Sequence, residues 1–241
     1  MGTKNWHKKL DRFYVFNNYW KKAISKKLGA SSNLKPVGHP FFDIDIKEGD
    51  NDLIVYAAHW SVGLPEGLSA FLETGHFMLN YAKKHPEFKW VFTHHPTFLF
   101  NVVDKGYMTQ NELDDYINEW KKIGYQGSNG DYLELFKNSK MLISDCSSYR
   151  IEYYKTAKPY IYIISSNPKR VKDDKFFNKI TKNYYKAHNV SELKFHLDNL
   201  LLNNFDPLKE GRKKDRYEFK NQNSADLIIK DIENLIKINP A

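Results

Sequence analysis

The sequence predicts an α/β protein built on a doubly wound, Rossmann-like parallel sheet, and three observations support this fold class. Continuous apolar runs such as Leu53–Ala58 recur along the chain, and they are typical of strands that are buried on both faces. Segments with the apolar spacing of helices lie between these runs. Because the chain has 241 residues and 41% of them are hydrophobic, it is long enough to bury a large core. This alternation of strands and helices implies right-handed crossovers and one parallel sheet.

The elements near the N-terminus form a separate segment. Residues 12–16 are predicted to be a short strand, and Asn18 is expected to cap a helix over residues 19–28. Gly29 is expected to close this helix. A turn-rich link and the acidic stretch 43–52 follow, and they separate the segment from the rest of the chain.

Four strands and four helices alternate in the central part of the chain, where turn residues separate them. The predicted strands are residues 53–58, 89–93, 140–144 and 160–164, and the predicted helices are residues 68–84, 111–123, 131–137 and 147–157. Two more helices, over 191–202 and 224–238, are predicted in the C-terminal part, and the charged segment 206–217 joins them.

The charge of the chain limits its partners. With 37 basic and 29 acidic residues the formal charge is +8, which favours a nucleic acid, an acidic membrane surface or a phosphorylated substrate. The lysines are dispersed in pairs, so most are expected to lie on solvated faces, and we expect no nucleic acid partner. The basic group between Lys8 and Lys27 is the best candidate for peripheral contact with the cytoplasmic face of a membrane.

Other patterns exclude several classes of protein. No apolar window approaches the length of about 18 residues that a spanning helix needs. Cys146 is the one cysteine, which excludes an internal disulfide and fits a reducing cytoplasm. The chain has neither the Walker nor the dinucleotide-binding glycine motif. Asp43 and Asp45 resemble the start of a calcium loop, but Lys47 stands where an oxygen ligand belongs. We therefore expect a cytoplasmic protein without a metal or cofactor.

The most informative stretch follows the third central strand. That strand is predicted to end at Ser144 and Asp145, and a helix to begin at Ser147 or Ser148. Free N–H groups and hydroxyls at such a turn bind phosphates, and ligands of open α/β sheets bind at the carboxyl ends of strands. Glu152, one turn further, is placed to accept hydrogen bonds from ribose hydroxyls. The alternative is an ordinary N-cap, because Ser and Asp commonly precede helices.

Two more polar strand ends are expected to face the same crevice. His95 follows the second central strand and is a candidate phosphate ligand or general acid, the alternative being a histidine that caps a loop. His59 and Ser61 follow the first central strand, and Trp60 between them would stack on a base or pack in the core. Cys146 is interpreted as a small packing residue rather than a nucleophile.

Five motifs occur in an order that resembles the carboxyl-terminal half of CDP-glycerol glycerophosphotransferases, the teichoic acid polymerase family. They are Gly38-His-Pro40 with Asp43, Tyr56-Ala-Ala-His-Trp-Ser61, His95-Pro96, Asp131-Tyr-Leu-Glu-Leu-Phe136, and Ser144-Asp-Cys-Ser-Ser148 with Glu152 and Lys158-Pro159. The resemblance covers residues 12–202, and the last motif is the most specific. It implies a two-domain glycosyltransferase-B fold, of which this chain supplies the nucleotide-binding half.

The resemblance also implies roles for individual residues. The implied nucleotide-binding residues are Ser144, Asp145, Ser147, Ser148, Glu152, Gly38 and Ser61, and the implied catalytic residues are His95, facing the transferred phosphate, and His59. Two departures from the family stand out. Ala58 replaces a usual proline, and the Trp-His-Gly motif of the family's amino-terminal domain, whose histidine is thought to be the base, does not occur.

Residues 12–29 resemble the last strand and helix of that amino-terminal domain. We therefore expect residues 1–35 to be its remainder with a linker and 36–205 to be the nucleotide-binding domain. Residues 206–241 would form a charged link and a C-terminal helix. In this interpretation nucleotide binding survives in the chain, and catalysis needs the domain that is missing.

Three functions fit these expectations. The first is transfer of glycerol phosphate or a similar polyol phosphate from a CDP-activated donor to a polymer or lipid-linked acceptor, in the synthesis of teichoic acid, capsule or lipopolysaccharide. The second is glycosyl transfer from a nucleotide sugar, which also carries a pyrophosphate. The third is nucleotide or partner binding without turnover. The phosphate-binding turn serves either of the first two, because both donors carry a pyrophosphate.

Overall fold

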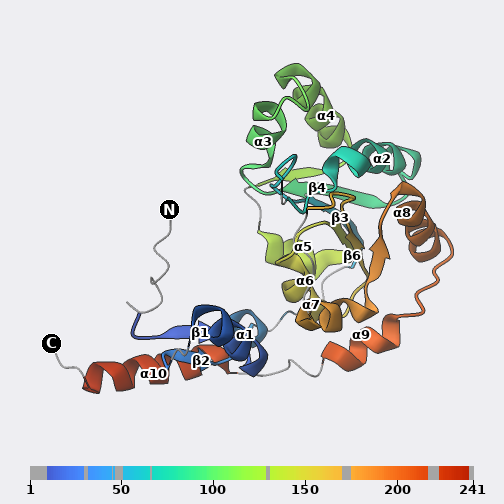
Figure 1. Ribbon diagram of the computed structural model, residues 1–241. Coiled ribbons are helices and arrows are strands. Elements are labelled where there is room, and N and C mark those ends of the chain that lie inside the picture. Colours follow the sequence, from blue (N-terminus) through green and yellow to red (C-terminus); the bar gives the residue numbers. More distant parts are fainter. Residues whose placement is uncertain are drawn as a thin grey trace. The chain divides into compact units, whose positions relative to one another are not determined.

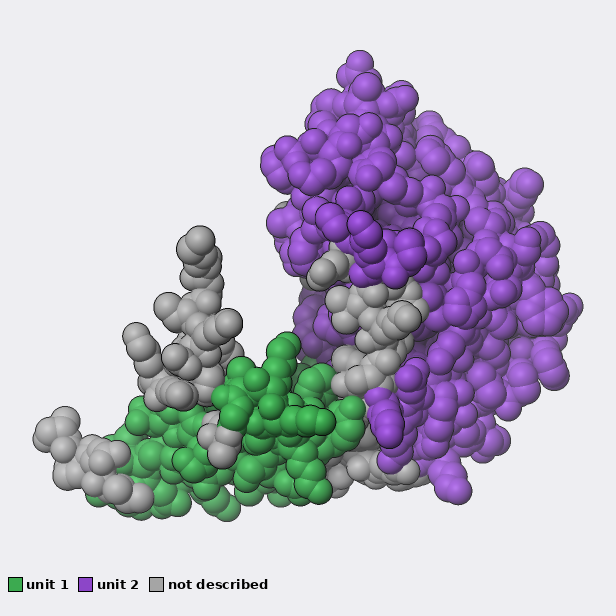
Figure 2. All heavy atoms as spheres, viewed as in Figure 1, with its two compact units in different colours: residues 1–45, 217–241 green, residues 46–216 purple. Residues whose placement is uncertain are grey.

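The computed structural model divides the chain into two compact units, which Figure 2 distinguishes by colour. The small unit comprises residues 1–45 and 217–241, and the sheet unit comprises residues 46–216. The structure describes residues 10–29, 32–44, 46, 51–65, 67–128, 131–169, 175–216 and 223–238. Within these ranges, no helix combines the length and apolar character that crossing a bilayer requires.

The sheet unit contains a six-stranded, wholly parallel sheet with the order β5-β4-β3-β6-β7-β8 (Figure 1). Its strands are β3 (Leu53–Ala58), β4 (Lys89–His94), β5 (Tyr125–Gly127), β6 (Ser139–Ser144), β7 (Tyr160–Ile163) and β8 (Tyr185–Ala187). The chain builds outward from β3 to β5 and then returns to place β6 on the other side of β3. The predicted doubly wound sheet is therefore confirmed, and its topological switch point lies between β3 and β6.

Helices cover both faces of this sheet. In Figure 1, α2 and α8 lie on one face, and α5 and α6 lie on the other. The helices are α2 (Phe71–Lys84), α3 (Phe98–Asp104), α4 (Gln110–Ile123), α5 (Tyr132–Asn138), α6 (Tyr149–Glu152), α7 (Lys175–Ile180), α8 (Val190–Leu197) and α9 (Lys209–Arg216). The two-sided cover explains the continuous apolar run of β3, because every residue after Leu53 in this strand is buried.

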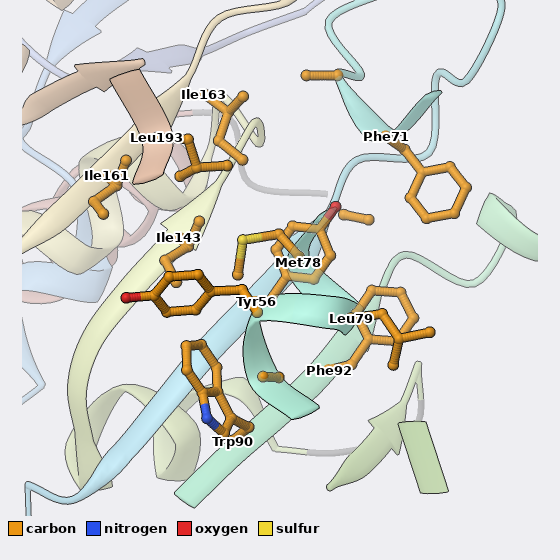
Figure 3. Packing of buried hydrophobic residues seen from close by; sticks show 14 of the residues in the cluster. Tyr56, Phe71, Met78, Leu79, Trp90, Phe92, Ile143, Ile161, Ile163 and Leu193 are labelled. Atoms are coloured by element: carbon orange, nitrogen blue, oxygen red, sulfur yellow. The ribbon is translucent and has the colours of Figure 1, made fainter. Parts of the chain in front are cut away.

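Buried hydrophobic side chains of the sheet and the helices pack together in the core (Figure 3), and stacked aromatic rings are part of it. The ring centroids of Tyr56 on β3 and Phe92 on β4 are 5.3 Å apart, and those of Phe92 and Trp120 on α4 are 5.2 Å apart. Trp90 and Trp120 are also fully buried. Rings in offset contact add to the free energy gained by burying their area. The carboxyl ends of β3, β4 and β6 therefore extend from a rigid base.

Several elements differ from the sequence-based expectation. The structure adds α3, α7 and the short strands β2, β5 and β8, and it places α9 in the segment 206–217 that was expected to be a link. Each of these strands has three residues, which are too few for a periodic pattern. Helix α2 begins at Phe71 and not at residue 68. The preceding N–H groups, from residues 68–70, donate to the side chains of Ser61 and Asp145 instead. The helix expected from Ser147 begins at Tyr149 instead, and after one turn it continues as a 3₁₀ segment over Tyr153–Thr156.

The small unit joins the two ends of the chain. A parallel strand pair, β1 (Phe13–Val15) and β2 (Leu34–Pro36), packs with α1 (Asn18–Leu28). Asn17, not Asn18, caps α1, since its side chain accepts a hydrogen bond from the N–H group of Trp20 at 3.0 Å.

Helix α10 (Ser224–Ile238) belongs to the small unit although it is distant from the other elements in sequence. Its Asp231 accepts hydrogen bonds from Arg12 at 2.6 Å and from the hydroxyl of Tyr14 at 3.1 Å. The N–H group of Ala225 donates to the carboxylate of Asp43 at 2.7 Å. Hydrogen bonds of α10 therefore connect this helix to residues 12–14 and to Asp43.

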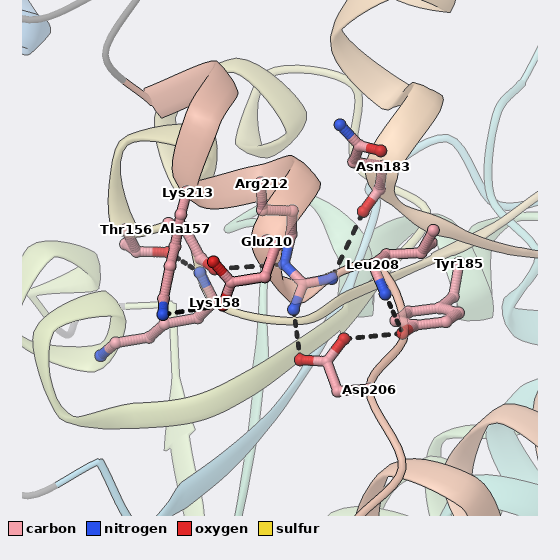
Figure 4. Close-up of polar contacts among 10 residues, drawn as sticks. All are labelled: Thr156, Ala157, Lys158, Asn183, Tyr185, Asp206, Leu208, Glu210, Arg212 and Lys213. Carbon is pink, nitrogen blue, oxygen red and sulfur yellow. Dashed lines mark hydrogen bonds and ion pairs between the residues drawn. The ribbon is translucent and has the colours of Figure 1, made fainter.

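A buried arginine fastens α9 to the sheet unit (Figure 4). The guanidinium of Arg212, whose residue is 1% exposed, donates to the carbonyl groups of Ala157 and Asn183 and to the carboxylate of Asp206. Asp206 also accepts from the hydroxyl of Tyr185 at 2.7 Å. A buried charge is tolerated only when it is paired and hydrogen-bonded, as it is here.

Replacing this arginine should destabilise the sheet unit strongly. We expect Arg212→Ala to lower the free energy of unfolding by about 3 kcal/mol, because it leaves Asp206 without its ion pair. Urea denaturation would measure the change. The matched control is Lys213→Ala, which removes an exposed ion pair with Glu210 and should cost less than about 0.5 kcal/mol. Equal losses for the two variants would contradict this role for Arg212.

Candidate functional site

A cavity of about 280 Å³ opens at the switch point of the sheet. Three strand ends contribute to it: Ala57–Trp60 at the end of β3, His94 and His95 at the end of β4, and Cys146–Tyr149 after β6. We call it the switch-point cavity. Four of the residues expected at the site, His59, His95, Ser147 and Ser148, therefore meet at one edge of the sheet, where open α/β sheets bind ligands.

Ser144 and Asp145 do not line this cavity; they are buried and bind other parts of the protein. The hydroxyl of Ser144 donates to the carbonyl of Ala57 at 2.7 Å and accepts from the N–H group of Cys146 at 3.0 Å. Asp145, which is 3% exposed, accepts hydrogen bonds from the N–H groups of His59 and Ala70, each at 2.7 Å. These two residues position the loops around the cavity.

The carboxylate of Asp145 also determines where α2 begins. It accepts a third hydrogen bond, from the hydroxyl of Ser69 at 3.1 Å, and so takes up donors at the amino end of this helix. Burial raises the pKa of Asp145 to about 6, although the three donors oppose the shift. At neutral pH the group is therefore a buried anion held by hydrogen bonds alone.

The histidines after β3 and β4 are held in the same way. The N–H group of Ser61 donates to Nδ1 of His59 at 3.3 Å, and the N–H group of Thr97 donates to Nδ1 of His95 at 3.2 Å. The hydroxyl groups of these two residues lie 2.7 and 3.0 Å from the same ring nitrogens. Because Nδ1 accepts, each neutral ring carries its proton on Nε2. Neither Nε2 has a partner among the described residues.

His59 and His95 are close enough to influence each other. The ring centroid of Trp60 lies 5.5 Å from that of His59 and 6.2 Å from that of His95. Burial, and then the neighbouring His95, lowers the pKa of His59 to about 4. His59 is therefore a neutral hydrogen-bond donor at pH 7. Trp60 is 38% exposed and lies at the rim rather than in the core.

His94, adjacent to His95 in sequence, has a structural role. Its Nδ1 donates to the carbonyl of His95 at 2.9 Å, and its Nε2 accepts from the hydroxyl of Tyr125 at 2.9 Å. Burial lowers the pKa of His94. Both ring nitrogens are thus occupied, which the sequence could not distinguish for two consecutive histidines.

The turn after β6 presents two serine hydroxyls without a capping role. Ser148 precedes α6 but makes no side-chain capping hydrogen bond, so the N-cap alternative does not describe it. Its Oγ lies 3.3 Å from the sulfur of Cys146, and the Ser147 hydroxyl has no partner among the described residues. Burial raises the pKa of Cys146, which fits packing rather than nucleophilic attack.

Besides Ser144 and Asp145, three more expected residues lie outside the switch-point cavity. Glu152 ends α6, and burial raises the pKa of its carboxyl group to about 7. Ser61 lines a neighbouring cavity. Gly38 belongs to the small unit, where its φ of 88° fits a turn and its N–H group donates to the carbonyl of Phe16.

Tyr149 is a lining residue that the sequence did not single out. It stacks on Tyr132, with ring centroids 5.9 Å apart, and closes one side of the cavity. Its place directly after two serines was the available signal. In the described ranges, no group of three or more His, Cys, Asp or Glu side chains is arranged to hold a metal ion.

Comparison with known proteins identifies the fold. No protein-family model matches the chain, and no curated protein matches it by sequence. Solved structures do match: the wall teichoic acid polymerase TagF has a TM-score of 0.58 at 15% identity, covering 98% of this chain and 60% of that one. MnaA of S. aureus in complex with UDP has a TM-score of 0.60 at 11% identity, covering 98% and 63%.

A third match is UDP-GlcNAc 2-epimerase of Neisseria meningitidis bound to UDP-GlcNAc, with a TM-score of 0.53 at 12% identity, covering 95% and 62%. The chain thus spans about three fifths of the length of these proteins. At such low identity the likeness assigns the fold alone. That fold is the Rossmann-like α/β fold of glycosyltransferase-B structures.

Replacing Asp145 should release the loops that it holds. In Asp145→Asn one carboxylate oxygen becomes an NH₂ group that cannot accept, so a buried donor loses its partner. We expect the free energy of unfolding to fall by about 2 kcal/mol and amide exchange at His59 and Ala70 to accelerate. The control is Asp131→Asn at the exposed cap of α5, where Asn serves as well as Asp. Equal effects of the two variants would contradict the positioning role.

The same variant predicts a pH dependence. The pKa of Asp145 is raised from 3.8 to about 6 on folding, so its stabilising contribution is complete below the lower value and is lost as the pH rises through the higher one. The stability difference between the wild type and Asp145→Asn should therefore shrink between about pH 4 and about pH 6 and stay constant above. A difference that grows over this window would contradict the shift.

His59 should titrate far below an ordinary histidine. We expect NMR titration of its ring to give a midpoint near 4, against the usual 6.5, because the ring is desolvated and faces His95. In His95→Gln the midpoint of His59 should rise but stay below 6.5, because burial is the larger cause of the lowered pKa and remains in the variant. A midpoint near 6.5 in the wild type would contradict the described burial of the ring.

Proposed function

We propose that the chain is the nucleotide-binding half of a transferase that moves glycerol phosphate, or a similar polyol phosphate, from a CDP-activated donor to an acceptor hydroxyl. The observation that carries this proposal is the switch-point cavity, whose lining contains two histidines with the proton on Nε2 and two serines whose hydroxyls do not cap α6. The product would be a cell-surface polymer of the teichoic acid, capsule or lipopolysaccharide type. The fold, which is that of TagF, is consistent with this class of reaction.

The chemistry of the cavity suits a pyrophosphate held by neutral donors. The described residues of its lining include no lysine or arginine, so hydroxyls, ring N–H groups and backbone N–H groups would carry the stabilisation. Such preorganised donors stabilise charge strongly where water is excluded. Ser147 and Ser148 would donate to the phosphates, and His59 and His95 would donate to the oxygens of the transferred group. Glu152, a turn further, would accept from the ribose hydroxyls.

The proposed step is an in-line substitution at phosphorus. An acceptor hydroxyl oxygen attacks the β-phosphorus, a new P–O bond forms, and the bond from the β-phosphorus to the bridging oxygen breaks. CMP leaves with the electron pair, and the proton of the acceptor goes to a general base. In the proposed orientation His59 and His95 point N–H groups at the phosphate, so they act as donors and not as that base.

Transfer of a sugar from a nucleotide sugar is the second candidate, and the UDP-bound MnaA structure favours it. In that reaction the nucleoside diphosphate leaves instead of the monophosphate. Release of CMP from CDP-glycerol would support the first candidate, and release of UDP or GDP from a sugar donor would support the second. Binding of nucleotide without any product would indicate a non-catalytic half.

Contact with an acidic membrane surface stays a prediction. Of the N-terminal lysines, Lys8 and Lys9 lie outside the described residues. Lys22, Lys26 and Lys27 are exposed on α1 and would be available for such a contact.

Titration calorimetry with CDP, UDP and GDP tests the nucleotide site. We expect the double variant Ser147→Ala with Ser148→Ala to bind nucleotide at least about tenfold more weakly, because two donors to the phosphates are lost. Its melting temperature should stay close to that of the wild type, since neither hydroxyl caps α6. Ser166→Ala, which removes a hydroxyl outside the switch-point cavity, is the matched control.

Two outcomes would contradict the proposal. If none of the three nucleotides binds at millimolar concentration, the cavity is not a nucleotide site. A large loss of stability with unchanged affinity would mean that the two serines serve the fold and not the ligand.

A further inference from the structure

A second cavity, of about 410 Å³, lies beside the first in the sheet unit. The loop after β3 and the loop after β7 contribute to its lining. The lining residues that carry hydroxyl groups are Ser61, Ser69, Tyr107, Ser165 and Ser166. Glu73 and Lys169 also line it. We call it the hydroxyl cavity.

One short segment separates the two cavities. His59 and Trp60 line the switch-point cavity, whereas Ser61 lines the hydroxyl cavity. The hydroxyl of Ser61 lies 2.7 Å from Nδ1 of His59, so a single hydrogen bond links the walls of the two spaces. Asp145 fixes the shared segment through the N–H group of His59. A ligand in one cavity is therefore an immediate neighbour of a ligand in the other.

Apart from Lys169, the side-chain donors that residues 165–169 bring to the hydroxyl cavity are already used. The hydroxyls of Ser165 and Ser166 donate to the carboxylate of Glu73 at 3.3 and 3.0 Å. The amide of Asn167 donates to the carbonyls of Pro65 and Gly67 at 3.2 and 3.3 Å. What stays open are lone pairs, chiefly on the hydroxyl of Ser166 and the carboxylate of Glu73. A ligand that fits must bring its own donors, and a polyhydroxylated chain does so.

Charge and apolar surface narrow the ligand further. Lys169 is the one cation among the described residues of the lining, and its ammonium group has no partner among them. It suits a single phosphate. Leu72 and Tyr107 are both exposed at the cavity, and Tyr107 lies against Gly63, where a Cβ atom would come within 2.0 Å of its ring. These side chains offer a surface on which a carbon skeleton can pack.

We propose that the hydroxyl cavity binds the acceptor, a polyol phosphate terminus whose hydroxyls donate to Ser166 and Glu73 and whose phosphate contacts Lys169. The role as acceptor rests on the proposed function, because it assumes a donor in the switch-point cavity. The shared segment from His59 to Ser61 would then bring the attacking hydroxyl next to the donor phosphate. Proximity of this kind supplies a large part of a transfer rate.

An NMR titration of the whole chain with glycerol 3-phosphate tests the site. We expect saturable amide shifts at Ser166 and Lys169, and none at Ser147 and Ser148. Lys169→Ala should weaken glycerol 3-phosphate binding about tenfold, whereas Lys169→Arg should preserve it, because a cation remains. Free glycerol, which has no phosphate, should bind both variants and the wild type equally. Lys169 is exposed, so its replacement does not threaten the fold.

Titration of the same samples with CDP separates this proposal from the function on which it rests. CDP should shift the amides of Ser147 and Ser148 and should bind Lys169→Ala as tightly as the wild type. If glycerol 3-phosphate shifts the CDP-responsive amides instead, or if Lys169→Ala binds it as tightly as the wild type, the acceptor site is refuted while nucleotide binding stands. If CDP fails and glycerol 3-phosphate binds as expected, the donor assignment is refuted and the polyol phosphate site stands.

Discussion

The carboxylate of Asp145 joins the three pieces of chain on which the candidate site depends. It lies at the end of β6, yet it binds the N–H group of His59 after β3 and the donors of Ser69 and Ala70 before α2. The hydroxyl of Ser144 adds a hydrogen bond from β6 to the carbonyl of Ala57 in β3. Ionising this buried group costs free energy, which the raised pKa expresses, and the hydrogen bonds offset part of that cost. The carboxylate of Asp145 thus fixes the conformation of the loop between the two cavities, because it accepts hydrogen bonds from both ends of that loop.

As far as the structure describes the lining of the switch-point cavity, it contains no lysine or arginine, and this has a chemical consequence. A cavity that binds anions through N–H and O–H dipoles needs those dipoles fixed in advance, because mobile donors would lose their advantage over water. The structure fixes them through backbone N–H groups that hold His59 and His95 at Nδ1. The ring protons are then directed by the fold rather than by the ligand. Both histidines achieve this with the residue two positions further along the chain.

The two units place different demands on the sequence. The sheet unit is held by a large apolar core with aromatic rings at its centre, and its polar anchors, such as Arg212, are buried. The small unit has a two-stranded sheet, and its last helix is tied by Asp231 to Arg12 and Tyr14. The first and last segments of the chain therefore fold together.

Much of the fold and part of the site follow from the sequence alone. The apolar run of β3 and the alternation with helices determined the parallel sheet, because a strand with both faces buried needs helices on both sides. The turn with Ser147 and Ser148 was recognisable because polar residues directly follow a buried strand. Short elements such as β5 and β8 were not predicted, since three residues carry no period and are strands only because a neighbour pairs with them.

Only the tertiary structure decided which polar turn residues line the switch-point cavity. In the sequence, Asp145 and Ser148 are both polar residues of one turn. In the structure, Asp145 is buried and accepts hydrogen bonds from N–H groups just after β3 and just before α2, whereas Ser148 lines the cavity. His94 and His95 likewise differ in their partners, because the hydroxyl of Tyr125 on another strand donates to Nε2 of His94. Hydrogen-bond partners that come from distant segments leave no local pattern. The sequence therefore determines where polar groups gather, and the packing of the strands determines what each of them binds.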